Sequence, residues 1–332
     1  MKIAVDFDDT LVPFVSVACN IWNNDNDIKL DPDECDHWGK NGSIWDNLIP
    51  IYDNPKVLYN QIVPQKSKDF INKLQNDGHE IYIVTAVAPK NMGIRAEQIL
   101  ENFNNIDESH IIMGSHKYLM KFDILLDDAP HNILDSITMT EYPILYRKPW
   151  NKNISGILSC NDLDEAYNII CQINSNKVKH IIKEPHIIAL IGPSGCGKHD
   201  YIKSHPEFIN IESLSTNPFS NYISEKEFKE KMKNNEFAET TYYAGYRYGT
   251  LKKVIDENLS KSNVIINIDI CGAMALKMKY PTKIVYLNRK KELLIRNIIR
   301  RNISEDEKTY RLISIDNERR NKKLCDEVIE NN

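Results

Sequence analysis

Three carboxylates stand close together near the start of the chain. Asp6, Asp8 and Asp9 follow the apolar run IAV and precede Thr10 in the stretch AVDFDDTLV. In an open α/β sheet, ligands bind at the carboxyl ends of the strands, where the loops leave the sheet. Three neighbouring acids repel one another, and a divalent cation held by oxygen ligands, typically Mg²⁺, would relieve that repulsion. The alternative is that these residues only cap the helix or turn that follows.

Further along the chain, polar residues again follow apolar runs. The run IYIVTA ends a predicted strand with Thr85, SHKYLMKFD contains Lys117, and DILLDD ends another predicted strand with Asp127 and Asp128. These additions favour a catalytic role for the first acids over simple capping.

A second group of residues has the spacing of a phosphate-binding loop. A P-loop has the pattern GxxxxGK followed by Ser or Thr, and GPSGCGKHD fits it with Gly192, Gly197 and Lys198, with Gly195 as a further glycine. Glycines let backbone N–H groups face the phosphates, and the lysine reaches the terminal ones. His199 stands where the hydroxyl ligand of Mg²⁺ is expected.

Short apolar runs alternate with amphipathic segments in both halves of the chain, and this alternation positions the two groups. It predicts βαβ units and parallel sheets. We therefore expect an α/β protein with two Rossmann-like domains, at 1–175 and 185–332, joined by a linker at 176–184. Residues 12–65 are inserted between the first strand and the next helix.

Composition excludes several classes of protein. The 332 residues carry a formal net charge of −5, which gives no general electrostatic reason to bind nucleic acid. The seven cysteines are scattered without a CxxC pair, which suits free thiols in a reducing cytoplasm. The N-terminus lacks a signal-peptide pattern, and no run approaches the ~18 apolar residues of a membrane helix. We expect a soluble, cytoplasmic protein.

The first group of residues resembles the haloacid dehalogenase (HAD) superfamily of phosphohydrolases. The order DxDxT, strand-end Thr, Lys and strand-end acidic pair is present over residues 1–170. The ten-residue gap from Lys117 to Asp127, and the later ILYRKPWN, look most like the 5'(3')-deoxyribonucleotidase branch. The resemblance implies a HAD core with a small helical cap formed by the insertion.

The resemblance also implies a role for each matching residue. Asp6 attacks phosphorus to give an aspartyl-phosphate, and Asp8 protonates the leaving oxygen and later activates water. Thr10, Thr85 and the catalytic Lys117 bind phosphoryl oxygens.

The implied metal is Mg²⁺, and the cap supplies possible base contacts. The ligands are Asp6, the Asp8 backbone carbonyl and the Asp127/Asp128 pair, of which either member is the direct ligand. Four aromatic residues of the insertion are candidates to face a nucleobase, although cap aromatics usually form the core of the cap: Phe14, Trp22, Trp38 and Trp45.

Residues 224–287 resemble guanylate kinase. Carried over position by position, Glu239 and Thr250 match residues that recognise guanine, Tyr248 matches a phosphate contact, and Asp269 matches the acid beside base and metal. The resemblance implies a P-loop kinase with a lid, ATP as phosphoryl donor and a nucleoside monophosphate as acceptor.

The arginines of this half are less certain matches. RNIIRRNISEDEKTYRL resembles the lid, with Arg300 and Arg311 nearest the phosphate-clamping positions, although a solvated helix face is the alternative. In guanylate kinases two further arginines bind the acceptor phosphate, but this chain has Asn217 and Phe219 there. Arg247 is a candidate to compensate for their loss.

His199 leaves three hypotheses for the second half. The domain is a kinase with changed acceptor specificity, a nucleotide-binding module without catalysis, or a structural relic. Lys198, Glu239 and Asp269 are retained, and they favour the kinase.

The two halves together predict a bifunctional enzyme of nucleotide metabolism. One domain removes the phosphate from a (deoxy)nucleoside 5'-monophosphate, and the other phosphorylates a different nucleoside monophosphate, since a shared substrate would give a futile cycle. A phage with non-standard DNA bases would have use for such a pair. The alternative from the same class is polynucleotide end repair by a kinase and phosphatase, which the acidic balance disfavours.

Overall fold

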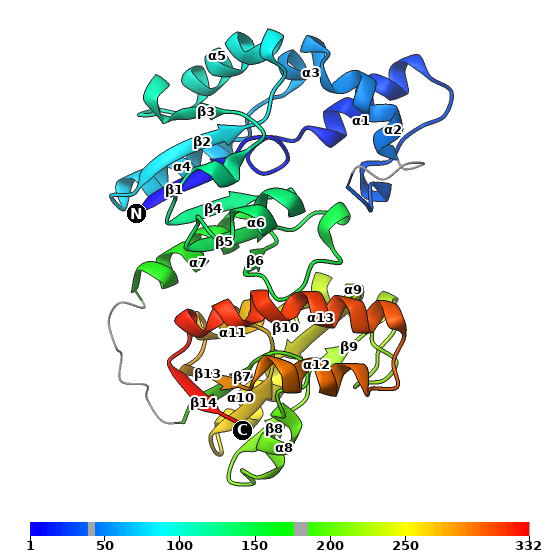
Figure 1. The fold of residues 1–332 in the computed structure, drawn as a ribbon, viewed down its shortest axis with the longest axis vertical. Coiled ribbons are helices and arrows are strands. Elements are labelled where there is room, and N and C mark those ends of the chain that lie inside the picture. Colours follow the sequence, from blue (N-terminus) through cyan, green and yellow to red (C-terminus); the bar gives the residue numbers. More distant parts are fainter. Residues whose placement is uncertain (39–43, 176–184, 332) are drawn as a thin grey trace. The chain divides into compact units, whose positions relative to one another are not determined.

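The computed structural model describes residues 1–38, 44–175 and 185–331 (Figure 1). The linker predicted at 176–184 lies outside these residues. The chain divides into two compact units, and each contains two stretches of sequence. Unit 1 is Met1–Lys152 with Ser159–Tyr167, and unit 2 is Asn153–Leu158 with Asn168–Asn332. None of the described helices is long and apolar enough to cross a membrane.

Unit 1 is built on a six-stranded parallel sheet of order β3-β2-β1-β4-β5-β6. The central strands are apolar runs such as ILLD, and all four side chains of that run are buried. This is the pattern of a parallel sheet covered on both faces. The strands are β1 (Lys2–Asp6), β2 (Glu80–Thr85), β3 (Ile111–Met113), β4 (Ile124–Asp127), β5 (Tyr142–Tyr146) and β6 (Ser159–Cys160). Because β1 lies between β2 and β4, the carboxyl ends of these three strands meet at one edge of the sheet.

The helices that follow the strands are amphipathic. In α4, for example, Ser67, Phe70, Ile71 and Leu74 lie on one face and are buried. These helices are α4 (Gln65–Asn76), α5 (Met92–Asn102), α6 (Pro130–Ser136) and α7 (Leu163–Ser175). Unit 1 ends within α7, and the helix from Asn168 onward belongs to unit 2. Short 3₁₀ turns lie between them, at η2 (Pro89–Asn91), η3 (Glu108–His110), η4 (Lys117–Leu119) and η5 (Pro149–Asn151).

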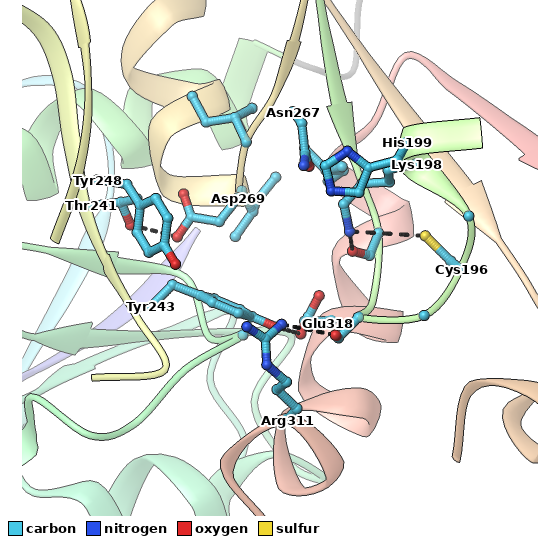
Figure 2. Close-up of a pocket in the computed structure, with 18 of the residues that line it drawn as sticks. Cys196, Lys198, His199, Thr241, Tyr243, Tyr248, Asn267, Asp269, Arg311 and Glu318 are labelled. Atoms are coloured by element: carbon cyan, nitrogen blue, oxygen red, sulfur yellow. Dashed lines mark hydrogen bonds between the residues drawn. The ribbon is translucent and has the colours of Figure 1, made fainter. Parts of the chain in front are cut away.

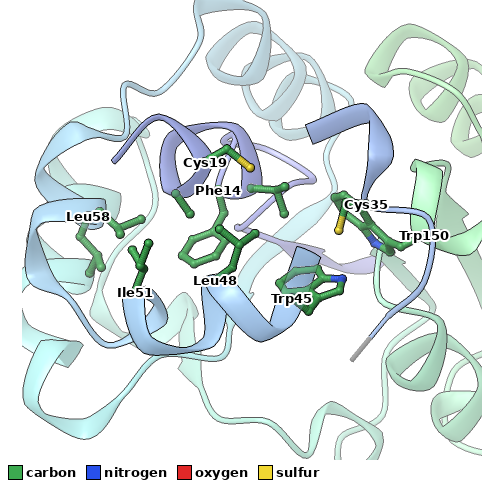
Figure 3. Close-up of a cluster of buried hydrophobic side chains, with 11 residues drawn as sticks. Phe14, Cys19, Cys35, Trp45, Leu48, Ile51, Leu58 and Trp150 are labelled. Atoms are coloured by element: carbon green, nitrogen blue, oxygen red, sulfur yellow. The ribbon is translucent and has the colours of Figure 1, made fainter. Parts of the chain in front are cut away.

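The segment between β1 and α4 forms a small helical cap with its own apolar core (Figure 3). Its helices are α1 (Val15–Asp25), η1 (Pro32–Glu34), α2 (Ile44–Tyr52) and α3 (Pro55–Asn60). Phe14 and Trp45 belong to this core, and Trp22 packs against it partly buried. Trp38 keeps 41% of its surface exposed and contacts the ring of Trp45. Core packing is therefore the main use of Phe14, Trp22 and Trp45, but not of the more exposed Trp38.

Unit 2 has a five-stranded parallel sheet of order β14-β13-β7-β12-β8. The central strand has the sequence IIALI and is buried throughout. The strands are β7 (Ile187–Ile191), β8 (Ile209–Ile211), β12 (Val264–Asn267), β13 (Thr282–Asn288) and β14 (Glu327–Glu330).

A second, antiparallel sheet and six helices complete unit 2. The small sheet has the order β10-β11-β9, with β9 (Leu214–Ser215), β10 (Phe237–Tyr243) and β11 (Tyr246–Leu251). The helices are α8 (Lys198–Lys203), α9 (Glu225–Lys233), α10 (Lys252–Leu259), α11 (Ile270–Lys277), α12 (Lys291–Ile299) and α13 (Glu305–Arg320), followed by the turn η6 (Asn321–Leu324). Ser224 and Glu227 form a capping box at the start of α9. Both units thus confirm the predicted α/β class with parallel sheets.

Candidate active sites

Asp6, Lys117 and Asp127 form a buried cluster at the carboxyl edge of the unit 1 sheet. Asp6 ends β1, Asp127 ends β4, and Lys117 begins η4. Lys117 Nζ lies 2.5 Å from Asp6 Oδ1 and 2.7 Å from Asp127 Oδ2. Burial opposes the charge of Lys117, but the two carboxylates outweigh it and raise the pKa of the ammonium group.

Asp128 completes a group of three acids that could hold a metal. One oxygen each from Asp6, Asp127 and Asp128 lie within 4.8 Å of one another. Burial raises the pKa of Asp6 to about 7, although Lys117 acts in the opposite direction. Burial, with Asp6 and Asp127 nearby, also raises the pKa of Asp128 well above its ordinary value. A hard divalent cation would neutralise this excess negative charge, so the donor set fits Mg²⁺.

Hydrogen bonds fix both members of the acidic pair. Asn132 Nδ2 donates to Asp127 Oδ2 at 3.0 Å. Trp150 Nε1 donates to Asp128 Oδ2 at 2.9 Å, and Thr10 Oγ1 contacts Asp128 Oδ1 at 3.5 Å. Thr10, which we predicted to bind phosphate, is therefore placed beside the acidic pair.

Asp9 has a capping role, which was the alternative considered for all three acids near the start of the chain. It adopts a φ of 55°, and its carboxylate accepts hydrogen bonds from the backbone N–H groups of Phe14 and Val15, at 3.0 and 3.1 Å. These are the N–H groups of the N-cap residue and of the first residue of α1, and N–H groups at a helix start lack partners within the helix. Asp9 thus caps the first helix of the cap.

Asp8 lies beside these acids with 19% of its side chain exposed. Arg95 Nη2 donates to its two oxygens at 2.9 and 3.0 Å, and Gln61 Nε2 donates to Oδ1 at 2.7 Å. Thr85 Oγ1, at the end of β2, lies 3.5 Å from Asp8 Oδ2. The two aspartates predicted for catalysis therefore have different partners, Lys117 for Asp6 and Arg95 for Asp8.

The P-loop of unit 2 joins β7 to α8. A Cβ on Gly192, whose φ is 144°, would lie 2.5 Å from the carbonyl oxygen of Leu287, so only glycine fits there. Gly195 and Gly197 also have positive φ values, of 86° and 98°. Lys198 Nζ donates to the carbonyl oxygen of Gly192. The loop thus has the glycine-dependent conformation that a phosphate cradle requires.

A cavity of about 600 Å³ brings most of the second group together (Figure 2). Its wall includes the P-loop with Lys198 and the exposed His199, and on other elements Glu239, Tyr248 and Asp269. Candidates for ATP binding and for acceptor binding therefore line one cavity, although Arg300, Arg247 and Thr250 do not.

Glu239 places a buried carboxylate in the wall of this cavity. It is 4% exposed, and Thr250 Oγ1 donates to its Oε1 at 2.6 Å. Its Oε2 has no hydrogen-bond partner among the described residues. Burial raises the pKa of Glu239 to about 7, with Asp269 adding to the effect. Asp269 itself accepts from Thr241 Oγ1 at 2.5 Å.

Of the two predicted lid arginines, the structure brings one to the cavity. Arg311 lines it, pairs with Glu307 at 2.6 Å and donates from Nη1 to Ser194 Oγ in the P-loop at 2.9 Å. Arg300 caps the C-terminus of α12 and is exposed, while its neighbour Arg301 lines the cavity. The side chains of adjacent residues at a helix end point in different directions. Arg301 therefore reaches the cavity in place of the predicted Arg300.

Arg247 was predicted to compensate for the missing acceptor arginines, but the structure does not bring it to the cavity. Arg247 does not line the cavity, and its Nε lies 2.8 Å from Glu225 Oε1. Tyr248, its neighbour on β11, does line the cavity, as alternation along a strand requires. Asn217 Nδ2 donates to the Tyr248 hydroxyl at 3.2 Å, and Phe219 is 83% exposed.

Comparison with known proteins identifies both halves. The family model described as "5' nucleotidase, deoxy (Pyrimidine), cytosolic type C protein" matches residues 1–177, and the guanylate kinase model matches residues 184–332. A guanylate kinase of Fusobacterium nucleatum is 31% identical over 131 residues, which cover 35% of this chain and 71% of that protein. The chain belongs to both families.

Two solved structures are similar to one half each. A guanylate kinase from Anaplasma phagocytophilum matches with 19% identity and a TM-score of 0.35, covering 44% of this chain and 77% of that one. A HAD hydrolase of family IA from Entamoeba histolytica matches with 14% identity and a TM-score of 0.36, covering 49% of this chain and 94% of that one.

The two memberships make the chain a bifunctional nucleotide-metabolism enzyme with a HAD-type 5'-nucleotidase domain and a guanylate kinase domain. Both resemblances drawn from the sequence motifs are thus confirmed.

Several residues at these sites escaped sequence reasoning. In the nucleotidase part they are Gln61, Arg95 and Trp150. In the guanylate kinase part, Glu318 lines the cavity and accepts hydrogen bonds from Tyr243 and Ser314, at 2.9 and 2.7 Å. Trp150 lies in ILYRKPWN, which the sequence marked only as a family resemblance and not as a contact of Asp128. No motif marks Gln61, Arg95 or Glu318, and the partners Asp8 and Tyr243 are distant from them in sequence.

Proposed function

We propose that the nucleotidase part hydrolyses (deoxy)nucleoside 5'-monophosphates through an aspartyl-phosphate, and that the guanylate kinase part phosphorylates a different nucleoside monophosphate with ATP. The buried cluster of Asp6, Lys117 and Asp127 beside Asp8 supports the hydrolysis most directly. The single cavity that joins the P-loop to Glu239 supports the transfer.

Hydrolysis would proceed in two displacements at phosphorus. First, an oxygen of Asp6 attacks phosphorus, the bond to the 5'-oxygen breaks, and Asp8 gives its proton to that oxygen. Then water attacks phosphorus, Asp8 takes a proton from it, and the bond to Asp6 breaks. Lys117 and Thr85 hold phosphoryl oxygens during both steps.

Mg²⁺ would be held by Asp6 and the Asp127/Asp128 pair, with the backbone carbonyl of Asp8 as a further ligand, and would neutralise charge on the phosphoryl group. Lys117 contacts two of these acids, so it offsets part of their negative charge before a cation arrives.

In the kinase, Lys198 and the P-loop N–H groups would orient the terminal phosphates of ATP, and Arg311, which contacts the P-loop at Ser194, would add a further positive charge. Glu239, oriented by Thr250, would accept hydrogen bonds from the base of the acceptor. GMP is the first acceptor to test, because guanylate kinases are the relatives of this half.

The test is a screen of all ribo- and deoxynucleoside monophosphates. It follows phosphate release without ATP and ADP formation with ATP, each with Mg²⁺ and with EDTA. We expect Asp6→Asn to abolish only hydrolysis, Lys198→Ala to abolish only transfer, and the two substrate lists to differ. Identical substrate lists would refute the proposed pairing, because the enzyme would then only consume ATP.

One set of observations favours a second candidate for the guanylate kinase part, namely nucleotide binding without catalysis. His199 replaces the hydroxyl ligand, and Asn217 and Phe219 replace the acceptor arginines. If no monophosphate causes ADP formation while ATP still binds and Lys198→Ala weakens that binding, this candidate replaces the kinase.

A further inference from the structure

Arg95 is the largest fully buried side chain among the described residues, with 1% of its surface exposed. Its guanidinium group lies over the ring of Phe7, 4.1 Å from the centroid. A buried cation is costly unless a carboxylate compensates for it. The carboxylate that does so is Asp8, the group assigned to proton transfer.

The contact fixes the orientation of Asp8. Arg95 Nη2 donates to both carboxylate oxygens, and Gln61 Nε2 adds a hydrogen bond to Oδ1 at 2.7 Å. Asp6, two residues earlier, has Lys117 as its partner instead. Arg95 therefore acts on the proton-transfer group and leaves the nucleophile to Lys117.

Arg95 is also linked to the end of the cap. Its Nη1 donates to Gln98 Oε1 at 3.0 Å, one turn further along α5. Gln98 Nε2 in turn donates to the carbonyl oxygens of Leu58 and Gln61, at 3.2 and 3.1 Å. Leu58 belongs to α3 and Gln61 caps it, so Gln98 holds the point where the chain returns from the cap to the core.

We propose that Arg95 is a positioning residue for the acid-base function of Asp8, and that through Gln98 it makes this function depend on the docked position of the end of the cap. The proposal rests on the proposed nucleotidase activity. It assigns Arg95 no contact with the substrate, so its effect must appear only in steps that move a proton.

Leaving-group dependence provides the test. A nucleoside 5'-alkoxide leaves only when protonated, whereas p-nitrophenolate leaves without a proton. We expect Arg95→Met to lower kcat for a nucleoside monophosphate about a hundredfold, the lower end of what general acid-base catalysis contributes. With p-nitrophenyl phosphate, rapid mixing should still show a first-turnover burst of p-nitrophenolate, followed by slow release of phosphate, because water activation also needs Asp8.

Two further variants separate positioning from stability. Arg95→Lys keeps the charge and should recover part of the nucleotide activity. Gln98→Leu leaves the Arg95–Asp8 contact in place and should lower nucleotide hydrolysis less, again with the burst retained; it also serves if Arg95→Met does not fold. The matched control is Asn91→Ala, since Asn91 is 2% exposed and donates to the Asp53 carbonyl oxygen of the cap at 3.1 Å without contacting Asp8.

The outcomes distinguish this inference from the proposed function. If the wild-type protein hydrolyses neither substrate, the proposed function itself fails. If it hydrolyses both, and folded Arg95→Met loses the burst and nucleotide turnover in equal proportion, or changes neither, Arg95 does not position Asp8. An equal loss in Asn91→Ala would likewise overturn the assignment, because the effect would then come from the cap as a whole.

Discussion

At the scale of single residues, the nucleotidase site is governed by an excess of buried negative charge. Lys117 balances part of it, since it contacts Asp6 and Asp127 within 2.7 Å. Asp128 lies near Asp6 and Asp127, and the side chains that donate to it, Trp150 and Thr10, are uncharged. The free energy of folding therefore depends on what else neutralises Asp128.

Asp128→Asn should stabilise the metal-free protein. A carboxyl group whose pKa is raised by folding ionises more readily in the unfolded chain, so above its ordinary pKa it lowers the free energy of unfolding. The pKa of Asp128 is raised, and asparagine keeps an oxygen for Trp150 without the charge. At about pH 8 in EDTA we expect a higher Tm for the variant than for the wild type.

Added Mg²⁺ should make the Tm of the wild type higher than that of Asp128→Asn, because a ligand that binds only the native state stabilises it. The wild-type Tm should rise with Mg²⁺ and that of Asp128→Asn much less. The exposed Asp25→Asn is the control and should follow the wild type. Equal Mg²⁺ responses in all three proteins would count against a metal at the three acids.

Glu239 should make acceptor binding depend on pH. Its pKa is raised to about 7 by burial, and the ionised form is the better acceptor of hydrogen bonds from a base. We expect the affinity for GMP, measured by calorimetry, to increase from about pH 6 to about pH 8 as the carboxyl group ionises. Glu239→Gln should bind at least about tenfold more weakly and without that pH dependence, since a hydrogen bond to a charged group contributes about 1.5–3 kcal/mol.

At the scale of elements, the two sites depend on how strands end. Asp6, Thr85 and Asp127 end three neighbouring strands, so the sheet itself brings them together. In unit 2 the P-loop follows β7, and its first glycine lies against the backbone of Leu287 on the adjacent strand β13. In both units backbone pairing thus places part of each site.

Gly192→Ala should abolish ATP binding and leave nucleotide hydrolysis intact. The added Cβ would lie 2.5 Å from the Leu287 carbonyl oxygen at a φ of 144°, so the loop must change shape. Gly93→Ala is the matched control, because a Cβ there meets nothing within 4 Å and the residue lies inside α5. That control should bind ATP normally and be more stable by about 0.5–1 kcal/mol.

Strand-end positions explain which residues the sequence predicts well. The carboxyl ends of parallel strands converge, so Asp6, Thr85 and Asp127 follow from apolar runs and their last residues. Arg95 does not, because an arginine on an amphipathic helix looks like a solvated one until Asp8 is placed opposite it. The partner lies 87 residues away in the sequence.

Two arginines of the second half were predicted to lie at the cavity and do not, for two different reasons. Alternation along β11 would have allowed only one of Arg247 and Tyr248 to face the cavity, so that choice was open to sequence reasoning. The choice between Arg300 and Arg301 was not, because it depends on the residue at which α12 ends.

At the scale of the whole molecule, the units do not follow the order of the sequence. The nucleotidase family model spans residues 1–177, yet 153–158 belong to unit 2. Ser155 Oγ accepts a hydrogen bond from the Ala244 backbone N–H at 2.9 Å, and Asn321 Nδ2 donates to the Gly156 carbonyl oxygen at 3.2 Å. A short piece of the nucleotidase sequence is thus part of the guanylate kinase unit.

Gly156→Ala should impair the kinase and spare the nucleotidase. At a φ of 77°, a Cβ would lie 2.7 Å from Glu318 Cγ and 2.9 Å from the Ser314 carbonyl oxygen, next to the cavity. Gly78→Ala, with a φ of 78° and nothing within 4 Å, is the control for backbone strain alone. We expect ATP affinity to fall in the first variant only; unchanged ATP affinity would mean that 153–158 contribute nothing to the site.

The interleaved boundaries also bear on how this gene can change. Because 153–158 precede β6 of unit 1 but pack in unit 2, no single cut of the chain yields both units complete. A recombination event at any one position would leave at least one descendant without a segment that packs in its unit here. We therefore expect rearrangements of this gene to keep both halves on one chain.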